Sequence, residues 1–295
     1  HDLAGIDTVV HLATDRSAAT PTATRRAINV DGTEALLDAA VAAGVSRLVL
    51  LTSAMVFGAQ AANPVPLDED AALTSGSPQG LVGDWVAMER AGLDRRGHGN
   101  NLEIVPVRPA SVVGAASDSL LPGLFEAVRL LAIRDCPCHW QFCHTDDLAT
   151  ALVLAATGAV AGPVTVGCDG WLDRHQVESI SRMRSVVLPA AVAFATAERL
   201  HRVGVLSSPA SDLHFLMHPW VVGSQQLLAA GWKPAWTNEA ALAEHLASLG
   251  ERAGRSLVVV DRRNATRAAA GAGATLAVVG SLALARARKG RREGR

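Results

Sequence analysis

The chain has 295 residues and a formal net charge of −1; 49% of its residues are hydrophobic and 19% are charged. This composition excludes a disordered chain and favours a well-filled core, and the near-zero charge argues against nucleic-acid binding. There is no tyrosine, and the two lysines are Lys233 and Lys289. Chemistry that needs a phenol, or an amine before residue 233, is therefore excluded.

The first part of the chain alternates predicted strands with a predicted helix. The apolar runs at 8–10 and 46–53 do not alternate polar with apolar residues, which is typical of buried parallel strands. Residues 25–43 between them have helical spacing, and Gly44 is expected to end that helix. Strand, helix and strand with short connections form a βαβ unit, which builds an open parallel sheet.

The middle of the chain continues this pattern less regularly. Residues 59–80 are predicted to form a loop, 83–95 a helix and 102–107 a third strand. The apolar stretch at 120–133 predicts another helix. An Ala/Leu helix is predicted within 142–156, with aspartates at its start to complement the helix dipole.

The rest of the chain is predicted to hold a smaller lobe and a tail. Residues 163–250 indicate a mixed lobe with helices near 187–203 and 238–248. Residues 268–285 carry no charge and lie between arginine-rich stretches. Eighteen residues is at the short end for crossing about 30 Å of hydrocarbon, so both a membrane anchor and a helix without membrane contact stay open.

Cysteines and histidines gather in one short stretch. Cys136, Cys138 and Cys143 lie close to His139 and His144, which invites a zinc interpretation. Structural zinc sites favour paired Cys-x-x-Cys spacing, and Cys-Pro-Cys-His departs from it. We therefore expect no metal, and ordinary buried thiols in a reducing cytoplasm.

Several short motifs together resemble one family. They occur in the chain order seen in extended short-chain dehydrogenases/reductases, the NAD-dependent epimerase/dehydratase family. A late stretch, Ala230-Gly-Trp-Lys-Pro234, is similar to the family's leucine-Gly-Trp-x-Pro stretch before its last helix, and the resemblance covers about residues 3–248. The motifs are Val10-His-Leu-Ala13, Asn29-Val-Asp-Gly-Thr33, Thr52-Ser-Ala-Met-Val-Phe-Gly58, Pro66-Leu-Asp-Glu69, Arg108-Pro-Ala-Ser-Val-Val-Gly114 and Phe142-Cys-His-Thr-Asp-Asp-Leu-Ala149.

The resemblance implies an α/β fold with a Rossmann-type parallel sheet and a smaller C-terminal substrate lobe. Residues 1–115 would form a partial NAD(P)-binding domain, and 116–250 a substrate lobe from which 142–157 returns to that domain. Residues 251–295 would form a basic linker, the apolar helix 268–285 and a basic tail. The family's glycine-rich turn, which lets the backbone approach a pyrophosphate, has no match here. The first three strands of the sheet are therefore expected to be missing from this chain.

The resemblance also assigns a cofactor site for NAD or NADP. Leu12 and Ala13 match the loop that passes the pyrophosphate and ribose, and Pro109 matches the turn that faces the nicotinamide. Thr52 is expected in the same site. Asn29 matches a helix asparagine that supports the active-site backbone, and a plain helix-start residue is the simpler alternative.

The catalytic residues depart from the family pattern. Ser53 matches the serine that hydrogen-bonds the reacting oxygen of the substrate, and its alternative is a strand-end serine that satisfies local backbone. In the family's Tyr-x-x-x-Lys motif, the lysine lowers the pKa of the tyrosine and holds the nicotinamide ribose. Leu81 stands at the tyrosine position and Trp85 at the lysine position. Leucine cannot donate a proton and indole is only a donor, so the standard mechanism cannot run.

Other ionisable residues nearby do not single out a replacement. Asp84, Glu89 and His98 are near Leu81 in sequence, but their spacing favours none of them. Arg108 is expected to pair with a carboxylate. His144 and Asp147 match a motif that mainly packs and caps a helix.

Three functions follow and stay open. The favoured one is a catalytically silent relative that binds a dinucleotide and a nucleotide-sugar-like small molecule. The alternatives are an active oxidoreductase or epimerase with non-standard catalytic groups, and a membrane-associated structural protein on the same fold. We expect the cytoplasm as its location, with membrane contact only through 268–285, no nucleic-acid partner, and a homodimer left open.

Overall fold

The computed structural model describes most of the chain up to residue 256. The described residues are 3–17, 20–74, 79–95, 101–114, 124–125, 127, 129–203, 206 and 208–256, with side chains described up to residue 250.

Four parallel strands form the main sheet, in the order β1-β2-β3-β7. The first three confirm the strands predicted from the apolar runs, to within two residues at each end. Within the described residues, β1 pairs on one side only, with β2. The strands are β1 (Thr8–His11), β2 (Arg47–Leu51), β3 (Glu103–Pro109) and β7 (Val164–Val166).

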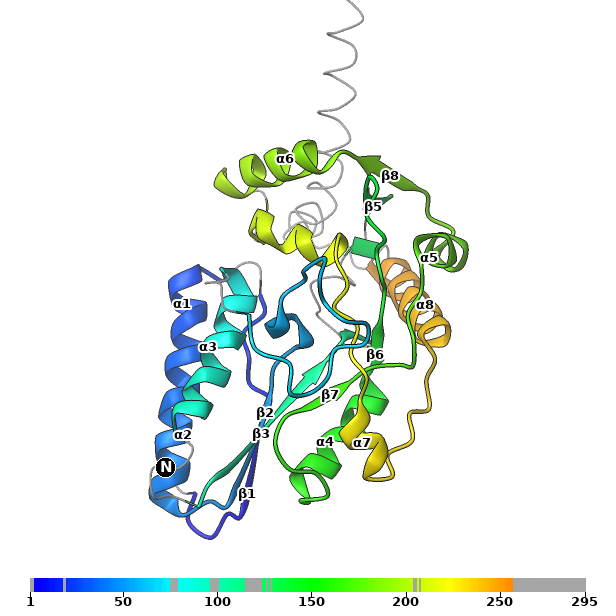
Figure 1. Ribbon diagram of the computed structural model, residues 1–295. Helices are drawn as coiled ribbons and strands as arrows, with labels where there is room; N and C mark the ends of the chain where they lie inside the picture. The colour runs from blue at the N-terminus through cyan, green and yellow to red at the C-terminus, as the bar shows by residue number, and fades with distance from the viewer. Residues whose placement is uncertain are drawn as a thin grey trace, which may run out of the picture.

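Helices cover the two faces of this sheet (Figure 1). One face carries α1 (Thr22–Arg26), a π-helical turn (Ala27–Asp31), α2 (Gly32–Ala43) and α3 (Gly80–Arg95), and α4 (Thr145–Ala156) lies on the other face. The helix predicted over 25–43 is confirmed, and Gly44 ends it in the left-handed conformation with φ 72°. The π-helical turn was not predicted, because a single wider turn barely alters the spacing of apolar residues.

The core centres on β2. Leu48, Val49 and Leu50 are fully buried, because helices pack on both faces of their strand. Leu37 of α2 and Met88 of α3 are also fully buried. Burial of each such side chain stabilises the fold by roughly 1.5–3 kcal/mol, which explains why β2 is apolar from Leu48 to Leu51.

A second group of elements, called the smaller lobe, comes partly between β3 and β7 in sequence and partly after β7. It contains two further parallel pairs, β4 with β6 and β5 with β8, and the helices α5 to α8 (Figure 1). The bounds are β4 (Ser111–Val113), β5 (Leu130–Ile133), β6 (Phe142–His144), α5 (Arg174–Ser181), β8 (Ser185–Leu188), α6 (Ala190–Arg202), a 3-10 helix (Ala210–Leu216), α7 (Gln225–Ala229) and α8 (Asn238–Ser256).

One predicted element is wrong in the part that the structure describes. The apolar stretch at 120–133 was predicted as a helix, but Leu130–Ile133 is strand β5, paired with β8. A short apolar run does not reveal whether it is helix or strand, and here a partner more than fifty residues later decided the outcome. The helix predicted within 142–156 begins at Thr145, after β6. The main sheet also takes in β7, beyond the 142–157 segment expected to return to it.

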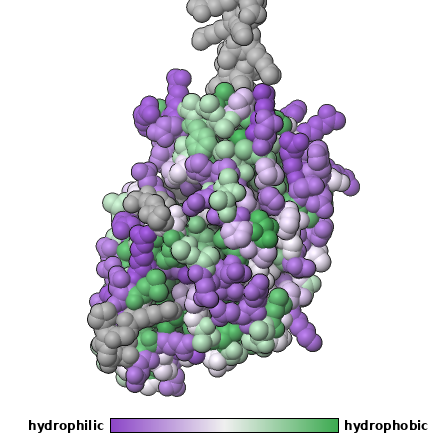
Figure 2. All heavy atoms as spheres, viewed as in Figure 1, coloured by the Kyte–Doolittle hydropathy of each residue, from purple (hydrophilic) through white to green (hydrophobic). Residues whose placement is uncertain are grey.

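The surface and the tail add two observations. On the face drawn in Figure 2, hydrophobic residues lie in several small patches between hydrophilic ones.

Among the helices of the described ranges, none combines the length and apolar character needed to cross a membrane. The predicted segments 251–295 and 268–285 lie essentially outside the described residues, except for the end of α8.

A buried ion pair joins the sheet to α3. Arg108 of β3 donates from Nη2 to Glu89 Oε2 at 2.6 Å and from Nε to both carboxylate oxygens at 3.0–3.1 Å. Thr52 Oγ1 donates to the same carboxylate at 2.6 Å, and Arg108 Nη1 donates to the Glu69 carbonyl at 2.9 Å. The side chains of Arg108 and Glu89 are 6% and 0% exposed. The prediction that Arg108 pairs with a carboxylate is confirmed.

Removing the arginine should leave a buried charge without its partner. We expect Arg108→Met to lower the free energy of unfolding by about 3–5 kcal/mol, measured by chemical denaturation. Arg202→Met is the matched control, because Arg202 pairs with Glu198 at 3.4 Å on the exposed surface of α6. Equal losses in the two variants would contradict the central role of the buried pair.

Candidate functional site

The predicted cofactor residues gather at the carboxyl edge of the main sheet. Because β1, β2 and β3 are parallel, the loops that follow them meet at one edge, where open α/β sheets bind ligands. Leu12 and Ala13 follow β1 and are exposed, Ser53 follows β2, and Pro109 is buried at the end of β3. The structure therefore brings together residues that are up to a hundred positions apart.

Asn29 holds the loop after β1. Its Oδ1 accepts the Asp15 backbone N–H at 2.7 Å, and its Nδ2 donates to the Asp15 carbonyl at 3.0 Å and to Asp84 Oδ2 at 3.2 Å. Asn29 is fully buried in the π-helical turn. Asn29 thus fixes the backbone of the loop after β1 at Asp15, and its role in supporting an active site stays a prediction.

Thr52 and Ser53 have different surroundings. The hydroxyl of Thr52 donates to Glu89, inside the core. Ser53 Oγ accepts the Met55 N–H at 3.2 Å and so caps the short 3-10 helix Ala54–Phe57. A serine hydroxyl that accepts one bond can still donate another. Ser53 can therefore cap its helix and also bind a ligand oxygen.

Leu81 and Trp85 occupy neighbouring turns of α3, and both are buried. Within the described residues, Trp85 Nε1 is buried without a hydrogen-bond partner, and so is Thr14 Oγ1 in the loop after β1. Buried polar atoms without a partner are rare and need an explanation. The Arg16 guanidinium carbon lies 6.0 Å from the centre of the Trp85 ring. Sequence analysis missed Thr14 and Arg16; their position directly after a predicted strand was the available signal.

The carboxylates near Leu81 are engaged by arginines. Asp84 accepts Arg25 Nε at 2.7 Å and lies 3.7 Å from Arg26 Nη1. Glu89 is held by Arg108 in the core. His98, the third residue considered as a replacement, lies outside the described residues.

Asp212 is a titratable group that sequence analysis missed. It lies on the 3-10 helix Ala210–Leu216, which follows Pro209, and Pro209 packs against Gly80 at the start of α3. Burial raises the pKa of Asp212 to about 7, against smaller lowering effects of His201, Ser208 and Arg25. No motif marks this residue, because its pKa depends on burial by distant segments.

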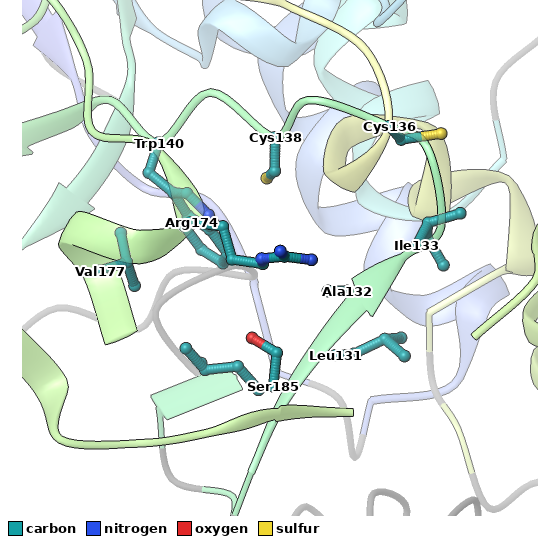
Figure 3. A pocket seen from close by; sticks show the side chains of 10 residues that line it. Leu131, Ala132, Ile133, Cys136, Cys138, Trp140, Arg174, Val177 and Ser185 are labelled. Carbon is teal, nitrogen blue, oxygen red and sulfur yellow. The ribbon is translucent and has the colours of Figure 1, made fainter. Parts of the chain in front are cut away.

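The cysteine-rich stretch borders a small hollow of about 10 Å³ in the smaller lobe, with room for little more than one water molecule (Figure 3). The sulfur atoms of Cys136 and Cys138 point in different directions there, and the Arg174 side chain extends between Cys138 and Ser185. Burial, and then the neighbouring Cys136, raise the pKa of Cys138 to about 12. A thiol that stays protonated is a poor metal ligand and nucleophile. In the described part of the chain, no three metal-binding side chains converge.

His144 and Asp147 have the packing and capping roles that the resemblance implied. His144 Nδ1 accepts the Asp146 N–H at the start of α4, and its ring stacks on Trp236 with 3.7 Å between centroids. Asp147 accepts the backbone N–H groups of Ala235 and Trp236. Both residues thus tie α4 to the segment before α8.

The comparison with protein families decides the identity of the fold. The model of the NAD-dependent epimerase/dehydratase family matches residues 1–167. The chain belongs to this family. The resemblance inferred from the motifs is confirmed, and so is the α/β class with a Rossmann-type parallel sheet.

Relatives of this family member are mostly uncharacterised. Protein y4nG of Sinorhizobium fredii is 27% identical over 280 residues, which cover 85% of this chain and 67% of that protein. Protein Rv0501 of Mycobacterium tuberculosis is 27% identical over 256 residues, covering 83% and 66%. A Stigmatella aurantiaca quinoline-oxide ketoreductase is 29% identical over 176 residues, covering 57% and 50%. The chain spans about two thirds of the length of the first two.

Solved structures show the same fold. Gox2253 superposes with a TM-score of 0.63 at 20% identity, covering 84% of this chain and 80% of that one. MoeE5, solved with UDP-glucuronic acid and NAD, gives 0.60 at 22%, covering 85% and 81%. The UDP-glucose 4-epimerase of Thermus thermophilus, solved with NAD, gives 0.58 at 17%, covering 83% and 78%.

The raised pKa of Asp212 predicts a pH-dependent stability. Between about pH 4 and 7 the folded state keeps a proton that the unfolded state releases, so the free energy of unfolding falls as pH rises. Asparagine does not titrate. The stability of Asp212→Asn relative to the wild type should therefore rise by about 2 kcal/mol from pH 4 to 7 and then level off, as measured by urea unfolding.

Asp38 provides the control for this titration. Its pKa is lowered, chiefly by a hydrogen bond from Arg95, so the stability of Asp38→Asn relative to the wild type should depend on pH only below about pH 4 and stay nearly flat from pH 4 to 7. A flat difference between Asp212→Asn and the wild type over this range would show that Asp212 is not protonated in the folded protein.

Proposed function

We propose that this protein binds an NAD-type dinucleotide at the carboxyl edge of β1–β3 and does not catalyse the family's hydride-transfer chemistry. Membership of the family and the arrangement of the three loops support the binding. The observation that carries the proposal is that the chain has no tyrosine and no lysine before Lys233, so that neither residue of the family's Tyr-x-x-x-Lys motif is present on α3.

The groups at the sheet edge fit the sugar and phosphate oxygens of a dinucleotide. Thr14 Oγ1 and Trp85 Nε1 are buried without partners in the described structure, and Ser53 retains a proton to donate. A bound dinucleotide would satisfy such groups, and it would supply a nicotinamide ring able to carry hydride. Leu12 and Ala13, exposed after β1, would contact it without any ionisable side chain.

Among the described residues of this site, none is available to move the substrate's proton. Proton transfer by a positioned side chain typically contributes about 10²–10⁴-fold to a rate. Leu81 has no proton to transfer, and an unassisted Ser53 hydroxyl is a poor acid and a poor base. Asp84 and Glu89 are held by arginines, so neither is available as a replacement.

A second candidate is an active enzyme with a non-standard acid or base. It is favoured by Asp212, a carboxyl group with a pKa of about 7 on the 3-10 helix that follows Pro209, the residue next to Gly80 of α3. Groups with such a pKa are suited to acid–base catalysis at neutral pH. In either case we propose a nucleotide-sugar-like ligand for the smaller lobe, because MoeE5 has the same fold and binds UDP-glucuronic acid.

Binding and turnover can be measured separately on the full-length protein. Calorimetric titration should show binding of NADH or NADPH. Comparison of the two dissociation constants would show which cofactor the protein prefers. With UDP-glucose or UDP-glucuronic acid and NAD, no product should form above the background rate. No binding of either cofactor at millimolar concentration would contradict the proposal.

A double variant tests whether the missing tyrosine and lysine account for the proposed lack of turnover. Leu81→Tyr combined with Trp85→Lys rebuilds the family motif on α3 and should raise turnover by about tenfold or more, whereas the matched pair Leu81→Phe and Trp85→Lys should not. Turnover by the wild type that Asp212→Asn abolishes would favour the second candidate instead.

A further inference from the structure

By the resemblance of the motifs, Trp85 stands where a family member has a lysine, and its environment differs from that of a tryptophan that only packs in the core. Its ring is 5% exposed, but its Nε1–H is buried without an acceptor in the described structure. A tryptophan chosen only for packing would leave this donor paired or at the surface, because an unmet buried donor costs free energy. The unpaired Nε1–H of Trp85 is therefore a candidate donor to a bound ligand.

Arg16 brings a positive charge to the same place from another element. It follows β1 by five residues, and its neighbour Asp15 is fixed on both sides of its backbone by Asn29. The Arg16 guanidinium lies over the Trp85 ring, with 6.0 Å between the guanidinium carbon and the ring centre. The loop is thus anchored next to the arginine, and the indole gives the arginine a face to rest on.

We infer that Arg16 and Trp85 form a composite binding pair for the dinucleotide, in which Arg16 supplies the positive charge and Trp85 Nε1 a neutral donor. This inference rests on the proposed function. Both groups would donate to ribose hydroxyl or phosphate oxygens, and Thr14 Oγ1 lies in the same loop as Arg16. The two tasks that one lysine performs in the family, carrying charge and donating, are divided here between two side chains.

The division has a chemical consequence. A flexible lysine amine can both hold a ribose and stabilise a neighbouring phenolate, whereas a guanidinium remains protonated and an indole does not titrate. With Leu81 one turn away, there is no phenol to activate. The pair would keep affinity for the dinucleotide without supporting proton transfer, as expected of a protein that binds a cofactor but does not turn it over.

Binding measurements on single variants of the full-length protein test the pair. Arg16→Gln should weaken NADH binding about tenfold, because a charge-assisted hydrogen bond is lost. It should also weaken the salt dependence of the dissociation constant, since a screened charge has been removed. Arg16→Lys should restore most of the affinity. Arg202→Gln, on exposed α6, is the matched control and should bind like the wild type.

Trp85→Phe removes the donor and keeps an aromatic ring. It should weaken binding about fivefold, as expected for the loss of one neutral hydrogen bond, and it should lower the energy transfer from tryptophan to bound NADH more than the loss of a distant tryptophan does. Trp171→Phe is the control: Trp171 is 43% exposed in the smaller lobe, and its loss should leave both readouts in place. Thermal melting of each variant without cofactor verifies that the fold is kept.

The outcomes separate this inference from the proposed function. If the wild type binds NADH and the Arg16→Gln and Trp85→Phe variants bind equally well, the composite pair is wrong and the proposed function stands. If the wild type binds neither NADH nor NADPH, both are wrong. A loss of affinity in Arg16→Gln that Arg16→Lys does not recover would assign Arg16 a structural role and overturn its part in the pair.

Discussion

Arg108 and Glu89 meet in the core, where both side chains are almost fully buried, and several segments are arranged around that contact. The arginine comes from β3 and the glutamate from α3. Thr52 at the end of β2 and the carbonyl of Glu69 complete the hydrogen bonds. A buried pair is tolerated only when its remaining donors and acceptors are met, so the strand ends and α3 must keep one arrangement. The buried pair therefore fixes the position of α3 relative to the sheet edge that carries the candidate site.

The requirement that buried polar groups have partners also distinguishes the groups that stabilise the fold from those that can bind a ligand. Glu89 belongs to the pair in the core, and Asp84 is held by Arg25 and Asn29. In contrast, Trp85 Nε1 and Thr14 Oγ1 are left without partners in the described structure. The site thus offers donors for a ligand, but its carboxylates serve the scaffold. Binding without proton transfer is the function that such a distribution supports best.

Much of the fold and part of the candidate site could be predicted. Apolar runs without alternation marked β1, β2 and β3, and a glycine marked the end of α2, because burial on both faces and helix termination act locally. The motifs gave the family, whereas the assignment of Ser53, Leu81 and Trp85 to one site stays a prediction. Strand β5 was mistaken for a helix, since its identity depends on pairing with β8, a contact that no local pattern records.

The amino-acid sequence by itself was enough to exclude the family's standard mechanism. The chain has no tyrosine and no lysine before Lys233, and no way of folding could supply them. Tertiary structure alone decided which of the remaining groups could act. It tied Thr52 to Glu89, brought Arg16 over Trp85 and raised the pKa of Asp212 to about 7 by burial. Each of these contacts joins segments that are far apart in the chain. Residue types and their spacing can be read from the sequence, but the distance between such segments is fixed only by folding.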